Sequence, residues 1–599
     1  CRSLRTGLYS WFLTLNGTNI RLNAFKYYKT LGHDQITLFL NEPHSTEKDS
    51  VAYKRFKECN PEAGESFFPG MFKDIYEPIW VTQNGQKSVN PLNTYANYVY
   101  TVVSTYGPYI DMYEVWNEPD YVSSQVYPKQ NPADYNVVEK WAIRDPHPCE
   151  MINMYAPIET YVRLMRITWE IVKFYDPTAR VCTGGLGYPT FLDAALRNTD
   201  NPADGAVSEE YPKKGGAYFD VLSYHAYPQW QLSYWDVAAN GFKYRRHSDA
   251  AADSAIIGDK RGFENVLSRY GYNGTTFPKK HFIITEVNIP RYTPGEIDYA
   301  NNKIKYINHI GSPEAQRNFT IKTIVKALMN DIKQLYFFRI GDAVDDSDVS
   351  INLNADPKDT HHRGEESGLN VMGMYKNLNA TGVTTKTAQL SVQGVANKTA
   401  SLLLSGYKYD PTQTAALKLP ANGTIQGAAF KKNTDFVYVL WARTSVDNSE
   451  NASANYSFPL SMGIAQIKRA EWDYSSTKAT TDILTSSVTL SGAPIFLFGG
   501  SATVGVADDF LDENSNILWT YQDGSDESTH IYLNLNVKDN VTVEIYNTAG
   551  TRVKALIETE DLSAGLTTYE IKNDEYDKGL YICKAVGHFG TSISKFVIK

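Results

Sequence analysis

The chain has 599 residues, of which 42% are hydrophobic and 21% are charged, a composition typical of a folded protein with more than one core. The formal net charge is -9, and acidic and basic residues are mixed along the chain, so there is no basic stripe of the kind that a nucleic-acid surface requires. The sequence also lacks an apolar run long enough to cross a bilayer. We therefore predict two to four domains, no nucleic-acid partner and no membrane span.

The five cysteines are few and widely spaced, and none of them forms a Cys-x-x-Cys pair or a cluster with histidine. A structural zinc site normally needs such a cluster. The sequence therefore predicts no zinc site and implies no metal or other cofactor. It permits a disulfide without specifying one.

Over residues 1–376, short apolar runs alternate with stretches of helical periodicity. Near-continuous apolar runs are typical of parallel strands that are buried on both faces. The alternation predicts a (β/α)8 barrel, also called a TIM barrel. Helices are predicted between strands, among them Pro91–Tyr106, Ile158–Tyr175 and Pro313–Asp331. The eight predicted strands are Gly7–Leu13, Gln35–Asn41, Pro78–Gln83, Met112–Glu118, Ala179–Gly184, Phe219–Tyr227, His281–Asn288 and Gln334–Ile340.

Beyond residue 376 the long helical patterns disappear, and strands alternate with turns rich in Gly, Asn, Ser and Thr. Residues 377–507 predict a β-sandwich, with Ala428–Trp441 and Ala493–Phe498 as strands. The polar run over residues 508–516 is predicted to be a linker. Residues 517–599 predict a small immunoglobulin-like β domain.

The last predicted domain contains the segments VEIYNTAGTRV, LSAGLTTYEI and KGLYICKAVG and the ending SKFVIK. These segments resemble the C-terminal sorting domain of type IX secretion substrates in Bacteroidota. The resemblance implies that the type IX secretion machinery reads this domain as an address. We therefore expect a secreted or cell-surface protein. A generic immunoglobulin-like module is the alternative interpretation.

The strongest local motif is Glu114-Val-Trp-Asn-Glu-Pro-Asp120, at the predicted end of the fourth strand. Active sites of such barrels lie at the carboxyl ends of the strands. Alternation along the strand predicts that Trp116 and Glu118 share one side, with Asn117 on the other until the chain leaves the strand. Pro119 cannot donate a ladder hydrogen bond and is predicted to end the strand.

A second carboxylate, Glu286, closes the predicted seventh strand. A glutamate at the end of a buried strand is costly unless it has partners. The sixth strand ends in Ser223-Tyr-His-Ala-Tyr227, where His225 and Tyr227 share a face because they are two residues apart. The hydroxyl of Tyr227 is expected to donate to Glu286 and to keep it ionised.

Two carboxylates that face each other across a barrel mouth are what glycoside hydrolysis requires. One protonates the leaving oxygen, and in retaining enzymes the other attacks the anomeric carbon from about 5–5.5 Å away. We predict a retaining O-glycosyl hydrolase that uses Glu118 and Glu286 as this pair. A separation of about 6.5–9.5 Å would instead indicate an inverting enzyme. A non-catalytic glycan-binding surface protein on the same scaffold is the alternative function.

The segments EVWNEPD, ITEVN and SYHAY together resemble the clan A glycoside hydrolases, and family 39 most closely. The resemblance implies that Glu118 is the acid/base and Glu286 the nucleophile. It also implies that Asn117 donates to the sugar 2-hydroxyl and that the segment holding His225 and Tyr227 orients Glu286. A plant or algal polysaccharide or oligosaccharide is the expected substrate.

The predicted eighth strand departs from that clan, which often has a tryptophan beneath the sugar. Here the segment reads Tyr336-Phe-Phe-Arg339-Ile-Gly-Asp342. Arg339, if it faces the pocket, would bind a carboxylate or sulfate of an anionic glycan. The alternative, which we favour slightly, is a salt bridge from Arg339 to Asp342 or to another acid of the barrel. Asp120 fits a substrate-binding residue and a turn residue equally well.

Overall fold

The computed structural model consists of two compact units. The barrel unit comprises Cys1–Met462 and Ser487–Phe496, and the C-terminal unit comprises Gly463–Ser486 and Leu497–Lys599. The predicted linker, 508–516, lies outside the described residues. The structure describes residues 2–61, 70–83, 85–122, 137–292, 295–298, 303–306, 310–342, 371–376, 378, 388–464, 466–475, 480–483, 486–499, 517–522, 528–535, 537–547, 550–588 and 590–598.

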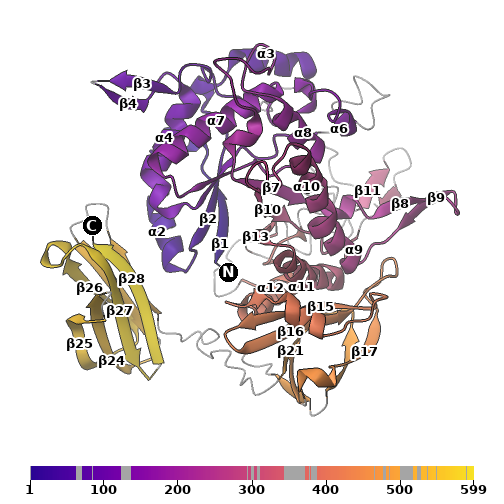
Figure 1. Cartoon of the computed structure of the whole chain (residues 1–599), viewed down its shortest axis with the longest axis vertical. Coiled ribbons are helices and arrows are strands. Elements are labelled where there is room, and N and C mark those ends of the chain that lie inside the picture. The colour runs from indigo at the N-terminus through magenta and orange to yellow at the C-terminus, as the bar shows by residue number, and fades with distance from the viewer. Residues whose placement is uncertain are drawn as a thin grey trace. The chain divides into compact units, whose positions relative to one another are not determined.

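The barrel unit is built on a seven-stranded parallel sheet that curls into a nearly closed barrel (Figure 1). Its edge strands β1 and β13 are in contact. Across the remaining opening, Thr37 Oγ1 lies 2.9 Å from Gln334 Oε1 and 2.9 Å from the Tyr336 hydroxyl. In sheet order the strands are β1 (Ser3–Gly7), β2 (Gln35–Leu40), β5 (Met112–Val115), β6 (Arg180–Cys182), β7 (Val221–Ala226), β10 (His281–Val287) and β13 (Ile332–Phe337).

Helices surround this sheet on the outside (Figure 1). The longest, α7, buries most of its apolar residues and ends before the Asp176-Pro177 step, as predicted. The side chain of Asn93 caps α4 by accepting the amide N–H of Ala96, and Gly107 follows the last turn. The helices are α1 (Ser10–Asn16), α2 (Leu22–Thr30), α3 (Ser50–Cys59), α4 (Thr94–Tyr106), α6 (Val137–Lys140), α7 (Ile158–Tyr175), α8 (Pro189–Arg197), α9 (Ser248–Asp253), α10 (Asp259–Arg269) and α11 (Pro313–Met329).

Two of the predicted barrel strands were wrong. The run Gly7–Leu13 is not a strand: β1 ends at Gly7, and Trp11, Phe12 and Leu13 belong to α1. A short apolar run fits both periodicities, and the true strand was missed because it is largely polar. The third predicted strand forms β3 (Trp80–Gln83), which pairs with β4 (Gln86–Val89) in a hairpin outside the barrel. Gly85, at a φ of 76°, makes that turn, and β2 pairs directly with β5.

Beyond the barrel strands, the barrel unit continues into antiparallel sheet. Helix α12 (Val392–Leu403) corrects our expectation that long helices end at residue 376. The predicted strand Ala428–Trp441 is a hairpin of two strands, because Asn433 turns the chain at a φ of 54°. The further elements are α13 (Pro411–Ala416), β14 (Lys408–Tyr409), β15 (Ile425–Lys432), β16 (Asp435–Ala442), β17 (Ser453–Ser457), β20 (Ser487–Ser491) and, ending in the C-terminal unit, β21 (Ile495–Gly499). The domain boundaries drawn from the sequence remain a prediction.

A buried polar cluster joins these strands to the helices of the barrel. Lys322 of α11 is 0% exposed and donates to Asp249 of α9 at 2.7 Å. The indole N–H of Trp441, on β16, donates to the same carboxylate at 2.8 Å. Because a buried charge is stable only with such partners, the cluster fixes this sheet against α9 and α11.

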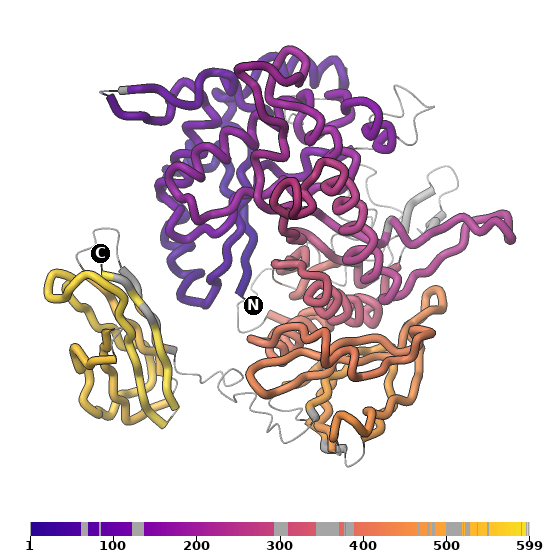
Figure 2. Tube along the Cα trace, viewed as in Figure 1, coloured from indigo at the N-terminus to yellow at the C-terminus, as the bar shows by residue number. Residues whose placement is uncertain are grey.

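The C-terminal unit holds two antiparallel sheets over one apolar core, drawn in yellow in Figure 2. Alternate residues of each strand point inward, as Ile531, Leu533 and Leu535 do on β23. One sheet is β22 (Ile517–Gln522), β23 (Ser528–Leu535) and β26 (Gly565–Lys572); the other is β25 (Arg552–Leu562), β24 (Asp539–Asn547), β27 (Gly579–Gly587) and β28 (Gly590–Ile598). The unit also contains the pair β18 (Ile467–Ala470) and β19 (Thr481–Ile483). Within the described chain, no helix is long and apolar enough to span a membrane.

A disulfide joins Cys59 to Cys149, which are 90 positions apart in the chain. Closing so long a loop restricts the unfolded chain, and replacing Cys59 with serine should lower the free energy of unfolding by about 2–4 kcal/mol. Denaturant unfolding followed by circular dichroism measures this change. Dithiothreitol should shift the midpoint of the wild-type chain by a similar amount and leave the Cys59→Ser/Cys149→Ser variant unaffected. A midpoint of Cys59→Ser equal to that of the wild-type chain without dithiothreitol would contradict the expectation.

Candidate active site

The barrel interior is layered, and its polar layers lie toward the carboxyl ends of the strands. An apolar layer of Met112, Cys182, Val221 and Ile283 comes first. On β7, Ser223 and His225 follow Val221 at steps of two and therefore point to the same interior face. Ser223 and His225 therefore lie in the next two layers of the interior, one in each.

Strand β10 delivers two adjacent side chains to the interior because it contains a β-bulge. Ile284 pairs with Tyr224, but the next partner of β7, His225, pairs with Glu286, so Thr285 is the extra residue. A bulge re-aims side chains in this way and often lies beside an active site. As a result, Thr285 and Glu286 both make interior hydrogen bonds.

Glu118 reaches the site through an irregular turn, and not by strand alternation as predicted. Strand β5 ends at Val115, and Trp116 and Glu118 have φ values of 72° and 47°. Such left-handed residues cost about 1–3 kcal/mol each and persist where neighbours hold them. The Glu118 amide donates to Gly184 O at 2.6 Å. Trp116 is buried and donates from its indole to the backbone of Asn153, so it does not share a side with Glu118.

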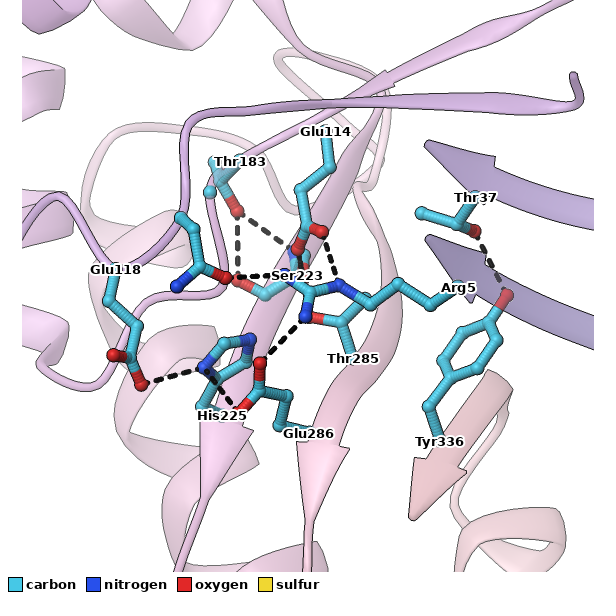
Figure 3. Close-up of polar contacts among 12 residues, drawn as sticks. Arg5, Thr37, Glu114, Glu118, Thr183, Ser223, His225, Thr285, Glu286 and Tyr336 are labelled. Atoms are coloured by element: carbon cyan, nitrogen blue, oxygen red, sulfur yellow. Dashed lines mark hydrogen bonds and ion pairs between the residues drawn. The ribbon is translucent and has the colours of Figure 1, made fainter. Parts of the chain in front are cut away.

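Figure 3 shows Glu118, His225 and Glu286 together at the carboxyl end of the barrel. His225 Nδ1 lies 2.8 Å from Glu118 Oε1 and 3.7 Å from Glu286 Oε2. One carboxylate oxygen of each glutamate and a ring nitrogen of the histidine lie within 4.8 Å of one another. The structure therefore brings the two sequence-predicted carboxylates face to face, with an imidazole between them.

Both carboxylate oxygens of Glu286 accept strong hydrogen bonds. Arg5 Nη1 donates to Oε1 at 2.7 Å, and the Tyr227 hydroxyl donates to Oε2 at 2.6 Å. Burial alone would raise the pKa of Glu286, but the charges of His225 and Arg5 and the hydrogen bonds from Tyr227 and Arg5 lower it below its usual value. Glu286 is thus held ionised and oriented, which is what a nucleophile needs.

The acids around His225 favour the charged form of its imidazole. Burial lowers the pKa of its imidazole, but the charge of Glu286 and the hydrogen bond to Glu118 outweigh burial and raise that pKa above its ordinary value. Gly185 allows the ring to lie here, because a Cβ at that position would collide with the imidazole. The site therefore places Arg5 and His225 beside its two acids.

Arg5 is the functional residue that our sequence analysis missed. Its side chain is 9% exposed and contacts Glu286, which is 281 positions away in the chain. The charges of Glu114 and Glu286 outweigh burial and raise the pKa of the guanidinium, so it stays charged. An arginine inside a short polar strand carries no local signal, and only the barrel topology places it here.

Asn117 also enters the site, half-buried. Its Oδ1 accepts from Arg5 Nη2 at 2.7 Å. Because the carbonyl oxygen is occupied, the amide NH2 is the group that Asn117 can offer to a substrate hydroxyl.

Asp120 lies near the site with its carboxylate turned into the fold. It is 1% exposed, and its Oδ2 accepts the amides of Gly187 and Tyr188 at 2.8 Å each. Burial, aided by the charge of Glu118 and opposed by those amides, raises the pKa of Asp120 to about 7. These contacts favour anchoring of the loop after β6 over direct contact with a substrate.

Arg339 follows β13 and is half-buried. Its guanidinium lies 5.6 Å from the ring of Phe338, which packs edge-on against Tyr227. The expected ion pair between Arg339 and Asp342 was wrong, since Asp342 pairs with Arg291. Arg339 thus remains a candidate for binding an anionic group.

The spacing of Glu118, His225 and Glu286 would also suit a metal ion. The guanidinium of Arg5 opposes a second cation here, because it already donates to the Glu286 carboxylate at 2.7 Å. The arrangement is better suited to proton transfer and nucleophilic attack.

Replacing Tyr227 with phenylalanine tests the environment of Glu286. Losing the donated hydrogen bond should raise the pKa of Glu286, so the acidic limb of the pH profile of kcat/KM should move to higher pH. The value of kcat/KM should fall about 10- to 100-fold, because a hydrogen bond to a charged group contributes roughly 1.5–3 kcal/mol. Tyr224→Phe is the matched control, since that hydroxyl faces outward to Ala255. An acidic limb that moves in Tyr224→Phe but not in Tyr227→Phe would contradict this account.

Residues 528–599 match the model of the secretion system C-terminal sorting domain. The match confirms the resemblance of the last domain to type IX sorting domains and identifies the protein as secreted or located at the cell surface. A comparison with curated proteins found no match for the chain.

Among solved structures, the chain is similar to glycoside hydrolases. A GH30 endoxylanase from Clostridium papyrosolvens C71 is 12% identical with a TM-score of 0.39, over 83% of this chain and 89% of that one. A glucosidase from Croceicoccus marinus is 10% identical with a TM-score of 0.40, over 83% and 89%. AbfB, a family 51 α-L-arabinofuranosidase from Bifidobacterium longum, is 9% identical with a TM-score of 0.38, over 80% and 78%. At these values the function has to be argued from the site, and the resemblance to family 39 stays a prediction.

Proposed function

We propose that the protein is a secreted retaining glycoside hydrolase that cleaves a plant or algal polysaccharide or oligosaccharide. One observation carries the proposal: carboxylate oxygens of Glu118 and Glu286 lie within 4.8 Å of each other at the carboxyl end of the barrel. Retaining enzymes hold their carboxyl groups about 5–5.5 Å apart, whereas inverting enzymes need about 6.5–9.5 Å to admit a water. The nearest oxygens of the two carboxylates are thus close enough for a retaining pair.

In the first step, Glu118 donates its proton to the glycosidic oxygen while Glu286 attacks the anomeric carbon. The bond from that carbon to the leaving oxygen breaks, and a covalent glycosyl ester forms on Glu286. In the second step, the Glu118 carboxylate takes a proton from water as the water oxygen attacks the same carbon. Glu286 leaves, and two inversions give a product with the original anomeric configuration.

The neighbouring groups serve these two steps. Arg5 and Tyr227 keep Glu286 ionised before attack and stabilise it as the leaving group afterwards. The His225 imidazole, whose Nδ1 lies 2.8 Å from Glu118 Oε1, can donate to that carboxylate between its loss and recovery of the proton. Asn117 donates to the sugar 2-hydroxyl.

Purified protein incubated with a panel of plant and algal polysaccharides and 4-nitrophenyl glycosides tests the proposal. Product chromatography reports cleavage, and proton NMR of the first-formed sugar reports its anomeric configuration. We expect a cleaved substrate whose configuration is retained. First-formed product of inverted configuration would contradict the proposed mechanism, and binding without cleavage across the panel would favour a glycan-binding protein.

A further inference from the structure

A layer of polar side chains crosses the barrel interior next to the proposed catalytic glutamates, on the side toward the amino ends of the strands (Figure 3). Glu114 of β5 is its centre and is 0% exposed. Glu114 Oε1 accepts from Ser223 Oγ at 2.6 Å and from Thr285 Oγ1 at 2.8 Å. Glu114 Oε2 accepts from Arg5 Nε at 2.7 Å. A carboxylate buried this deeply needs such partners, and it has three.

Arg5 connects this layer to the site. Its Nε donates to Glu114, its Nη1 to Glu286 and its Nη2 to Asn117, each at 2.7 Å. A guanidinium is planar, with its donors in a fixed fork, so the direction of one N–H bond determines the directions of the others. The contact to Glu114 therefore fixes where Arg5 presents its donor to Glu286.

The partners of Glu114 come from the same strands as the site residues. Ser223 is two residues before His225 on β7, and Thr285 directly precedes Glu286 on β10. Glu114 itself is four residues before Glu118. A single buried carboxylate thus ties together β1, β5, β7 and β10, the strands that position the acid, the nucleophile and their donors.

Glu114 also balances charge. Arg5 makes an ion pair with each of two carboxylates, Glu114 and Glu286, so the negative charge of Glu114 opposes the positive charge of Arg5 at Glu286. Without the negative charge of Glu114, the positive charge of Arg5 would act on Glu286 unopposed. The carboxylate of Glu286 would then bind its proton more weakly. Among the described residues, the charged and titratable groups that face Glu286 are Arg5 of β1, Tyr9 after it, Glu114 and Glu118 from β5 and its turn, His225 of β7 and Tyr227 just after β7.

We propose that Glu114 is a positioning residue for this reaction: acting through Arg5, it holds Glu286 in the orientation for attack and moderates the positive charge upon it. The inference rests on the proposed function, since it assigns Glu114 a part in the same two-step hydrolysis.

Glu114→Gln separates charge from shape. Glutamine can still accept from Arg5 Nε, but it carries no negative charge, so the pKa of Glu286 should fall. The acidic limb of the pH profile of kcat/KM, measured on the aryl glycoside cleaved best, should therefore move to lower pH. This is opposite to the shift expected for Tyr227→Phe. If Glu114 only stabilised the fold, its substitution would lower the melting temperature and leave this acidic limb in place. An unmoved acidic limb would overturn the moderating role.

Glu114→Ala removes the anchor altogether. We expect kcat to fall about 100-fold, as for a reacting group displaced by roughly 1 Å. A crystal structure of this variant should show Arg5 Nη1 beyond hydrogen-bond distance of Glu286, a readout that needs no substrate. Arg5 unmoved in that structure, or kcat within about twofold of wild type, would overturn the positioning role.

Asp200→Asn is the matched control for both variants. Asp200 is 0% exposed and pairs with Arg163 and Arg166, so its loss should lower stability without changing kcat or the pH profile. Glu286→Gln separates the two hypotheses. If that variant keeps wild-type turnover, the proposed function fails; if it is inactive while the Glu114 variants behave as wild type, only the present inference fails.

Discussion

Glu286→Gln should lower kcat at least about 10⁴-fold while leaving polysaccharide binding nearly intact, because the glycosyl-enzyme forms on this carboxylate. Glutamine keeps the size of the side chain and most of its hydrogen bonds but is a poor nucleophile. Initial rates on the cleaved substrate give kcat, and isothermal titration calorimetry gives binding.

A smaller substitution makes this prediction specific. In Glu286→Gly, azide can enter the vacated space and attack the anomeric carbon from the face that Glu286 uses. The expected product is a glycosyl azide of inverted configuration. Glu170→Gln is the control, since that carboxylate bonds Arg166 and Trp80 outside the site. Unchanged turnover in Glu286→Gln would remove Glu286 from the mechanism.

Glu118→Gln should have an effect that depends on the leaving group. On the polysaccharide, which needs a proton on the departing oxygen, kcat/KM should fall about 10²- to 10⁴-fold. On a 2,4-dinitrophenyl glycoside, whose leaving group needs no proton, formation of the glycosyl-enzyme should be little changed. The second step should be slow, and a burst of dinitrophenolate in stopped-flow absorbance should reveal it.

Azide distinguishes the acid/base from the nucleophile. It attacks the accumulated glycosyl-enzyme of Glu118→Gln without needing a base, so turnover should recover and yield a glycosyl azide of retained configuration. An equal loss of rate on both substrates, with no recovery in azide, would contradict the assignment of Glu118.

The barrel and its two carboxylates could be predicted from the sequence because their signals are local. Apolar runs mark β2, β7 and β10, and a glutamate at the end of such a run has no structural explanation. His225 and Tyr227 followed from simple alternation on β7, and the structure keeps that alternation. The motif around Glu118 was predicted to lie at a strand end, and it does.

The remaining features depend on contacts that no local pattern records. Strand β1 is largely polar and includes Arg5, which contacts the site. The first barrel strand was therefore predicted over the apolar residues that follow β1. The bulge at Thr285 and the left-handed turn at Trp116 change which side chains face inward, and alternation alone cannot predict either. The run Pro78–Gln83 was predicted as a barrel strand, but its strand β3 pairs with β4 in a hairpin that turns at Gly85.

Labelling by a 2-deoxy-2-fluoro glycoside with a dinitrophenyl leaving group tests the central claim most directly. The fluorine slows both steps, and the good leaving group lets the first proceed, so the glycosyl-enzyme accumulates. The sugar type should follow the substrate found in the polysaccharide panel. Peptide mass spectrometry should place one fluorosugar on Glu286, and Glu286→Gln should remain unlabelled. A label on any other residue, or hydrolysis of the parent glycoside with inversion, would contradict the pairing of Glu118 and Glu286.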